Sequence, residues 1–195
     1  MSKWFYSIAI SRVQTKIHKT KRAYFIQRGA DDIITEYRQG RLIEHSQDFT
    51  FEDEWLYVQV QNDIYCFENV SNNFEKMTLV ETGKFELEDK AKLLYDRFGP
   101  ALCNFKDELI FISGGIGKNS VERYTIETDE WELAPPMIIE RHFHSSVAAG
   151  SAIYVFCGQD DIDAYINSIE RLDCSDCLDN DFDFEAMGWQ QIMTT

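Results

Sequence analysis

The most constraining feature of this 195-residue chain is a repeat of its own sequence at an offset of 44 residues. Residues 97–115, RFGPALCNFKDELIFISGG, align without a gap with residues 141–159, RHFHSSVAAGSAIYVFCGQ. In both copies an Arg opens the segment, small residues follow, and an apolar run ends at a glycine. A repeat of this period indicates a fold built from stacked copies of one supersecondary unit.

The first copy continues with residues that point to a family. Gly114 and Gly115 end the apolar run, a polar loop and the run VERYTIE follow, and Trp131 lies seven residues beyond Tyr124. A double glycine followed by a Tyr and then, six or seven residues later, by a Trp resembles the kelch repeat. The resemblance implies an all-β fold: a partial or incomplete kelch-type β-propeller of four-stranded antiparallel blades.

The second copy matches this pattern less closely. SIERL and Trp189 follow its glycine, but Cys157-Gly158-Gln159 stands where a double glycine is expected. Glycine reaches positive φ without steric cost, and the aromatic residues supply apolar area between blades. We therefore interpret as structural the residues of the repeat pattern: Gly114, Gly115, Tyr124, Trp131, Arg141, Gly158 and Trp189.

Weaker units precede the clear pair. The runs WLYVQV, IYCFE and FEKMTLV indicate a degenerate blade over residues 49–80, and AYFIQRG, DIITEYR and RLIE indicate a partial one over residues 24–48. The clear blades cover residues 96–137 and residues 138–195, the latter with an acidic loop insertion. Residues 1–23 are expected to form a basic segment with one strand.

Two further expectations concern the array as a whole. LEDKAKLLYDRF predicts a short amphipathic helix, because apolar residues recur every three to four positions at Leu87, Ala91, Leu94 and Phe98. The three to four repeats fall at or below the lower end of the four to eight blades of a propeller. We expect the chain to be a piece of a longer propeller; closure by self-association and an open array are the alternatives.

Composition argues against several classes of partner. The 44% apolar content and the lack of an apolar run near 18 residues argue against disorder and against a membrane span. The net charge of −15 divides into +6 for residues 1–41 (nine Lys/Arg, three Asp/Glu) and −21 for the rest (ten against 31). We interpret the basic part as a solvated or compensated face, and expect neither nucleic acid nor membrane as a partner.

The five cysteines predict a reducing environment. Their odd number and scattered positions do not resemble a disulfide framework, which favours the cytoplasm. Cys174 and Cys177 form a single C-x-x-C within an acidic stretch. Zinc normally takes four ligands and nearby acids raise a thiol pKa, so we interpret this stretch as an exposed loop with two incidental cysteines.

His142 and His144 are the strongest candidates for metal ligands. An H-x-H pair on a strand places both rings on one face. The kelch resemblance implies instead that Arg141 and His144 belong to the fold, at the start of the innermost strand. Two acidic clusters, Asp160, Asp161 and Asp163 and then Asp179, Asp181 and Asp183, lack the Gly and Glu of an EF-hand loop. The sequence also contains no P-loop or nucleophile motif. We therefore expect no metal, no cofactor and no catalytic residue.

The resemblance also implies a function. Kelch propellers generally bind protein or peptide partners through the loop between the second and third strands and the segment leading into the innermost strand. On this chain those positions are Lys118, Asn119, His142, Phe143, Gln159 and Asp160. Neighbouring acids favour a basic peptide.

We accordingly expect a non-enzymatic adaptor or scaffold. A ubiquitin-ligase role, as in relatives that carry a BTB domain, would need sequence outside these residues. The alternative is a fragment of a propeller enzyme, such as a galactose-oxidase-like oxidase or a sugar isomerase, which would need a pocket with convergent polar groups.

Overall fold

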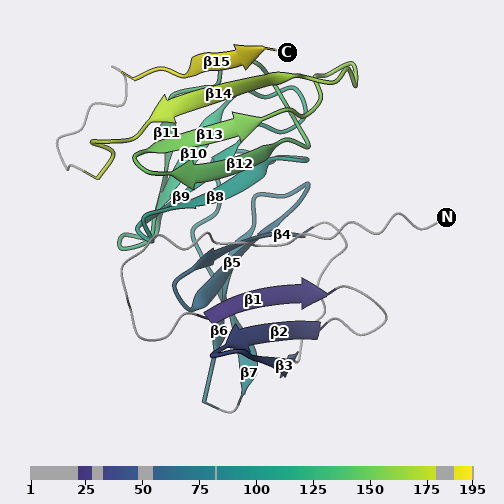
Figure 1. The fold of residues 1–195 in the computed structure, drawn as a ribbon, viewed down its shortest axis with the longest axis vertical. Helices are drawn as coiled ribbons and strands as arrows, with labels where there is room; N and C mark the ends of the chain where they lie inside the picture. Colours follow the sequence, from purple (N-terminus) through teal and green to yellow (C-terminus); the bar gives the residue numbers. More distant parts are fainter. Residues whose placement is uncertain (1–21, 28–32, 48–54, 82, 179–186, 195) are drawn as a thin grey trace. The chain divides into compact units, whose positions relative to one another are not determined.

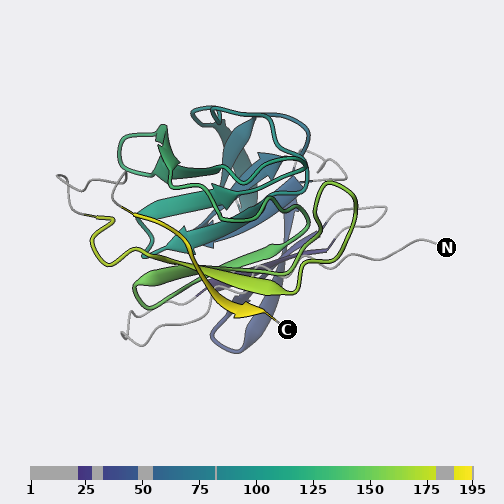
Figure 2. The same ribbon diagram turned by 90° about the horizontal axis from the view of Figure 1, so that it is seen from above.

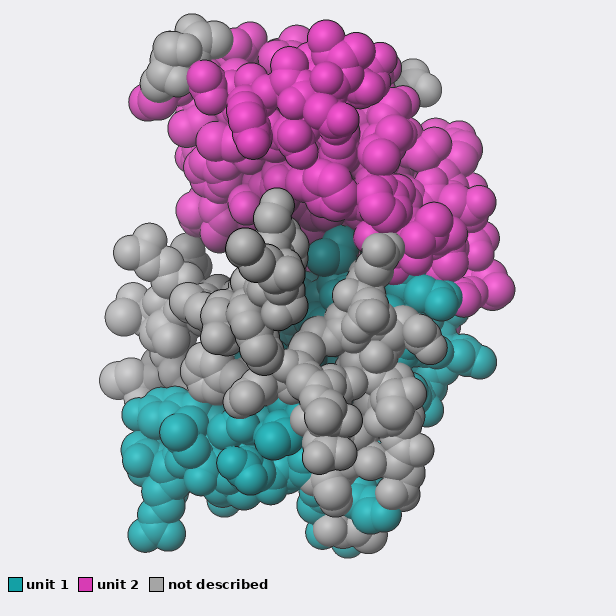
Figure 3. Space-filling view, turned by 90° about the vertical axis from the view of Figure 1, so that its right-hand side faces the viewer, with its two compact units in different colours: residues 1–68, 74–90 teal, residues 69–73, 91–195 magenta. Residues whose placement is uncertain are grey.

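The computed structural model describes residues 22–27, 33–47, 55–81, 83–178 and 187–194, which form fifteen strands and no helix (Figure 1). Within these ranges there is accordingly no helix that could cross a membrane. The chain divides into two compact units, shown in different colours in Figure 3. Unit 1 comprises residues 1–68 and 74–90, and unit 2 comprises residues 69–73 and 91–195.

Unit 1 contains seven strands among its described residues. They are β1 (Arg22–Gln27), β2 (Ile33–Arg38), β3 (Arg41–Gln47), β4 (Trp55–Val60), β5 (Asp63–Glu68), β6 (Phe74–Leu79) and β7 (Lys84–Asp89). Strands β1 to β3 form one antiparallel meander and β4 to β7 another. A short parallel pairing of β3 with β7 joins the two meanders into a seven-stranded sheet.

Unit 2 consists of two four-stranded antiparallel sheets. The first contains β8 (Ala101–Phe105), β9 (Leu109–Ser113), β10 (Val121–Thr125) and β11 (Glu130–Ala134). The second contains β12 (Ser145–Ala149), β13 (Ala152–Phe156), β14 (Ser168–Asp173) and β15 (Gln190–Thr194). The predicted all-β fold of four-stranded antiparallel blades is therefore confirmed.

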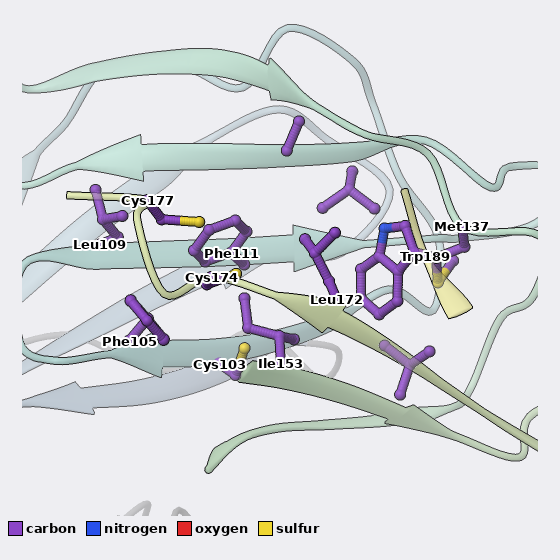
Figure 4. Close-up of a cluster of buried hydrophobic side chains, with 13 residues drawn as sticks. Cys103, Phe105, Leu109, Phe111, Met137, Ile153, Leu172, Cys174, Cys177 and Trp189 are labelled. Carbon is purple, nitrogen blue, oxygen red and sulfur yellow. The ribbon is translucent and has the colours of Figure 1, made fainter. Parts of the chain in front are cut away.

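The core of unit 2 lies between its two sheets, which stack face to face (Figure 2). Figure 4 shows aromatic, aliphatic and sulfur-containing side chains meeting there from both sheets. Phe111 of β9 and Leu172 of β14 are almost fully buried in this cluster. Trp189 closes one side of it and donates a hydrogen bond from its indole Nε1 to the carbonyl oxygen of Pro135 over 2.8 Å.

Unit 1 has a separate core between its two meanders. Tyr24 and Ile34 on the first meander pack against Met77 and Phe85 on the second. The rings of Tyr24 and Phe85 meet edge to face, with their centroids 5.4 Å apart. In both units, then, one four-stranded meander is covered on one face by its neighbour along the chain.

The helix predicted around residues 87–98 is wrong. Residues 84–89 are strand β7, which pairs with β6, and the following residues are irregular. Phe85 is buried and Leu87 half-buried, whereas Glu86 and Glu88 are exposed, which is the alternation of a half-buried strand. This β7 strand is the fourth of its meander and lies beyond the predicted limit of residue 80. Residues 1–21 of the predicted basic segment and residues 179–186 of the acidic insertion lie outside the described residues, whereas Arg22 and Ala23 begin β1.

The two blades of unit 2 are equivalent in a register that the ungapped alignment misses. Three residues, 106–108, link β8 to β9, but only Gly150 and Ser151 link β12 to β13. The offset is therefore 44 residues for the first strand and 43 for the second. Since a one-residue slip turns every side chain to the other face of a sheet, the correction decides which residues are equivalent.

Candidate partner-binding loops

The glycine positions show the corrected register most directly. Gly114 and Gly115 have φ angles of 67° and 118°, and the matching values at Cys157 and Gly158 are 56° and 95°. The double glycine of the first blade is therefore replaced by Cys157-Gly158, not by Gly158-Gln159. Only Gly fits at Gly114, since an added Cβ would lie 2.3 Å from the carbonyl oxygen of Arg141.

A buried arginine holds this turn in each blade. Arg97 donates from Nη1 to the carbonyl oxygens of Gly114 (2.5 Å) and Ser120 (2.9 Å), and Arg141 donates from Nη1 to that of Cys157 (2.7 Å). Because Gly114 and Cys157 are equivalent, Arg97 and Arg141 make the same hydrogen bond in the two blades. They tie the loop after the second strand to the segment that leads into the first.

The aromatic pair of the repeat lies at the other end of the first blade, next to the turn between β10 and β11. The rings of Tyr124 and Trp131 face each other across β10 and β11 with centroids 5.1 Å apart. Tyr124 donates its hydroxyl to Asp129 over 2.6 Å, and the Trp131 indole donates to the carbonyl oxygen of Ala91 over 2.8 Å. Both rings are buried, so they pack and anchor a connection and present no free polar group to a ligand.

Backbone hydrogen bonds bring the six predicted contact residues together at one end of unit 2. The amide of Arg141 donates to the carbonyl oxygen of Lys118 over 3.3 Å. His142 and Gln159 exchange two hydrogen bonds of 2.9 Å as an isolated antiparallel bridge. Asn119 joins Met137 through its backbone and side chain, while Phe143 and Asp160 follow the bridged pair directly.

These six residues differ in what they offer to a partner. Among them only Phe143 is largely exposed, at 55%, although its ring contacts those of Phe98 and His142. His142 is buried at 2% exposure. Lys118, Asn119, Gln159 and Asp160 are half-buried and partly occupied by loop hydrogen bonds.

The exposed apolar side chains of these loops are mostly residues that the sequence reasoning missed. Ile116 is 49% exposed, Ile162 78% and Tyr165 83%. The amide of Ile116 donates to the carbonyl oxygen of Phe98, and Tyr165 bridges to Gln159. Together with Phe143, they form what we call the loop surface: Ile116, Phe143, Ile162 and Tyr165. An apolar residue inside an otherwise acidic loop is the sequence signal that could have found Ile162 and Tyr165.

Acidic groups border the loop surface. One oxygen of the Asp160 carboxylate accepts the amides of Ile162 (3.1 Å) and Ala164 (2.9 Å), so this side chain closes its own loop. Asp161 and Asp163 are exposed instead. The carboxylates available to a partner are therefore neighbours of the predicted Asp160.

The two histidines do not share one face of a strand. They precede β12, and Phe143 between them has a positive φ of 50°. His144 Nε2 lies 2.9 Å from the Ser113 hydroxyl, and burial together with nearby Arg141 lowers the pKa of His144 to about 3. Within the described ranges no three His, Cys, Asp or Glu side chains are placed to hold a metal ion.

The interpretation of the C-x-x-C stretch as an exposed loop is wrong. Cys174 is fully buried and Cys177 is 2% exposed, both in the core of unit 2 (Figure 4). A hydrogen bond from the Cys174 thiol lowers the pKa of Cys177, and Arg123 lowers it further. Both thiols pack in the core between the two sheets, so apolar packing decides the position of this turn, although its sequence is acidic.

Comparison with known families fits this geometry. The model of the kelch motif matches residues 97–138, which span β8 to β11 with their double glycine. Among solved structures, that of YjhT is similar in fold to this chain, with a TM-score of 0.58 and 13% sequence identity, over 73% of this chain and 51% of YjhT. The chain thus spans about half the length of that structure. A search of curated proteins gives no match.

Proposed function

We propose that this chain, in which residues 97–138 match the kelch motif, is a non-enzymatic interaction module that binds a protein or peptide through the loop surface. Kelch repeats commonly mediate protein–protein interaction, and loops held by a rigid scaffold are a frequent place for binding residues. The observation that carries the proposal is the exposure of Tyr165 and Ile162, at 83% and 78%, on a loop that is hydrogen-bonded to the neighbouring segment at His142. Apolar groups held exposed in this way are typical of contact sites.

The chemistry of the border suggests the partner. Asp161 and Asp163 lie within the same loop as the apolar pair, and the chain as a whole carries a net charge of −15. Complementary charge speeds association and selects partners. We therefore propose a peptide that combines an apolar anchor with Lys or Arg. The five free cysteines, four of them buried, support a cytoplasmic setting for this interaction.

A random peptide library selected on the 195-residue chain tests this function. Selected peptides are expected to contain basic and apolar residues, and fluorescence anisotropy should show binding weakened about tenfold or more by the double variant Ile162→Ser/Tyr165→Ser, since anchors of this kind dominate interface energies. Leu133→Ser, which alters an apolar residue of β11 that is 53% exposed, is the control. Failure to select any peptide, or equal loss in the control, would contradict the proposal.

Metal analysis of the purified chain tests the absence of an oxidase-type activity. We expect less than stoichiometric copper after dialysis. The polar groups at this end of unit 2 support this expectation, because His144 pairs with Ser113 and the arginines are committed to backbone carbonyls. One equivalent of tightly held metal would favour the enzyme instead.

A further inference from the structure

The corrected register reveals a sheet face that is buried in one blade of unit 2 and exposed in the next. On the first blade, the face turned toward the second carries Cys103, Phe111 and Val121, each at most 5% exposed. Strand pairing places these three residues side by side: Cys103 pairs with Phe111, and Val121 pairs with Ser113 two residues further along β9.

The equivalent residues of the second blade form what we call the C-terminal face. They are Val147, Tyr154, Phe156, Ile169 and Met193. Val147 is 37% and Met193 52% exposed, and the other three are half-buried. The opposite face of the same sheet, with Ile153, Val155 and Leu172, is the one that covers the first blade. The C-terminal face is thus apolar, like the equivalent face of the first blade, which the second blade covers.

A second polar feature repeats on the same face. Arg123 of the first blade donates from Nη1 to the carbonyl oxygen of Cys177, over 3.4 Å, and so reaches the covering blade. Its equivalent, Arg171, donates instead to the exposed Asp173 of its own strand over 2.6 Å. The Arg171 guanidinium is thus equivalent to one that contacts a covering blade, but it bonds to a residue of its own strand.

The first meander of unit 1 offers the complementary surface. Its inner face, with Tyr24 and Ile34, covers the following meander. Its outer face carries Tyr37 and Leu42, which pair directly across β2 and β3 and are 47% and 69% exposed. We call Tyr37 and Leu42 the N-terminal face. Each of the two faces carries exposed apolar side chains.

We propose that two copies of this chain associate head to tail, the C-terminal face of each covering the N-terminal face of the other. Each copy contributes four meanders, and the chain spans about half the length of the related fold of YjhT. A two-fold pair would bury both faces of both copies in two identical contacts. This inference does not depend on the loop surface.

The test is the solution mass by size-exclusion chromatography with light scattering over a hundredfold range of concentration. The wild-type chain should give a discrete species of twice 22.8 kDa. Val147→Glu and Leu42→Glu, each at an exposed position, should raise the dimer dissociation constant about tenfold or more, because each buries a charge in both contacts. Ile162→Glu, on the loop surface, should leave the dimer intact.

A mixing experiment makes the head-to-tail arrangement falsifiable. Val147→Glu chains mixed with Leu42→Glu chains should form a dimer more readily than either variant alone, because one of the two contacts then contains no substitution. Circular dichroism should report the same strand content in all variants, and Met193→Glu replaces Val147→Glu should that variant not fold. A folded wild-type monomer of 22.8 kDa at every concentration, which is the result expected if further blades lie outside this chain, would overturn the proposal. Polydisperse aggregate, or a dimer insensitive to both substitutions, would overturn it equally.

Discussion

Arg97 and Glu122 form an ion pair whose side chains are both fully buried, with Nη2 and Oε1 2.8 Å apart. Arg141 and Glu170 repeat it in the next blade with a separation of 2.5 Å. Each Glu also accepts a backbone amide from the segment before the blade, from Leu94 in the first case. The pair therefore joins the third strand of each blade to the connection that precedes it.

Breaking this pair should be far more costly than breaking a surface pair. Glu122→Gln leaves the Arg97 charge without its counter-ion in the protein interior, and we expect a loss of roughly 3–5 kcal/mol in the free energy of unfolding. The matched control is Glu132→Gln, because Glu132 pairs with Arg123 at the surface and surface pairs are worth about 1 kcal/mol or less. Urea denaturation of both variants measures the difference; similar losses would show that the buried pair has no special role.

The sequence predicts the blades of unit 2 well because their turn chemistry is local. A double glycine, an apolar run and a Tyr–Trp spacing each act within a few residues, and the matching strands are present from Ala101 to Thr194. The helix prediction failed for the opposite reason. Leu87 fits a helical and a strand-like pattern equally, and pairing of β7 with β6, a contact between separate segments, decides between them.

The register and the loop surface depend on distances that a sequence alignment does not contain. The missing residue in the β12–β13 hairpin moves Gly158 by one position, and an ungapped alignment hides it. The predicted loops are brought together, but whether His142 or Tyr165 is the exposed residue depends on how the loops fold over each other. Burial of Cys174 is likewise a property of packing.

Two glycines of one loop should respond very differently to alanine. Gly114 and Gly117 have similar φ angles of 67° and 63°, but a Cβ on Gly114 would lie 2.7 Å from the His144 ring while one on Gly117 meets nothing within 4 Å. Gly117→Ala pays only for its backbone conformation, about 1 kcal/mol, whereas Gly114→Ala adds a clash and should lose roughly 3 kcal/mol or more. Thermal and urea unfolding of the two variants check this. Equal losses would refute the close approach at Gly114.

His144 should make the protein sensitive to acid. Its pKa falls from 6.5 to about 3 on folding, mainly because burial disfavours the charged ring. Below pH 6.5 the unfolded chain therefore binds a proton that the folded chain does not, and stability falls by about 1.4 kcal/mol per pH unit until the folded pKa is reached. His144→Gln, which can still bond to Ser113, should have a shallower decline by that amount. Urea titrations from pH 7.5 to 4.5 measure both slopes, and parallel slopes would exclude His144 as the cause.

The order in which the cysteines react with iodoacetamide should follow their accessibility first and their pKa second. Cys157 is the exposed one, so iodoacetamide should label it in the folded protein, while Cys66, Cys103, Cys174 and Cys177 react only on unfolding. Burial raises the pKa of Cys103 to about 12, and Cys174, whose thiol hydrogen-bonds to Cys177, also has a raised pKa. Cys177 has a lowered pKa, and the thiolate is the reactive form. In urea just below the unfolding transition, peptide mass spectrometry should therefore find Cys177 labelled before Cys174. Early labelling of Cys174, or of both in native buffer, would contradict the buried pair.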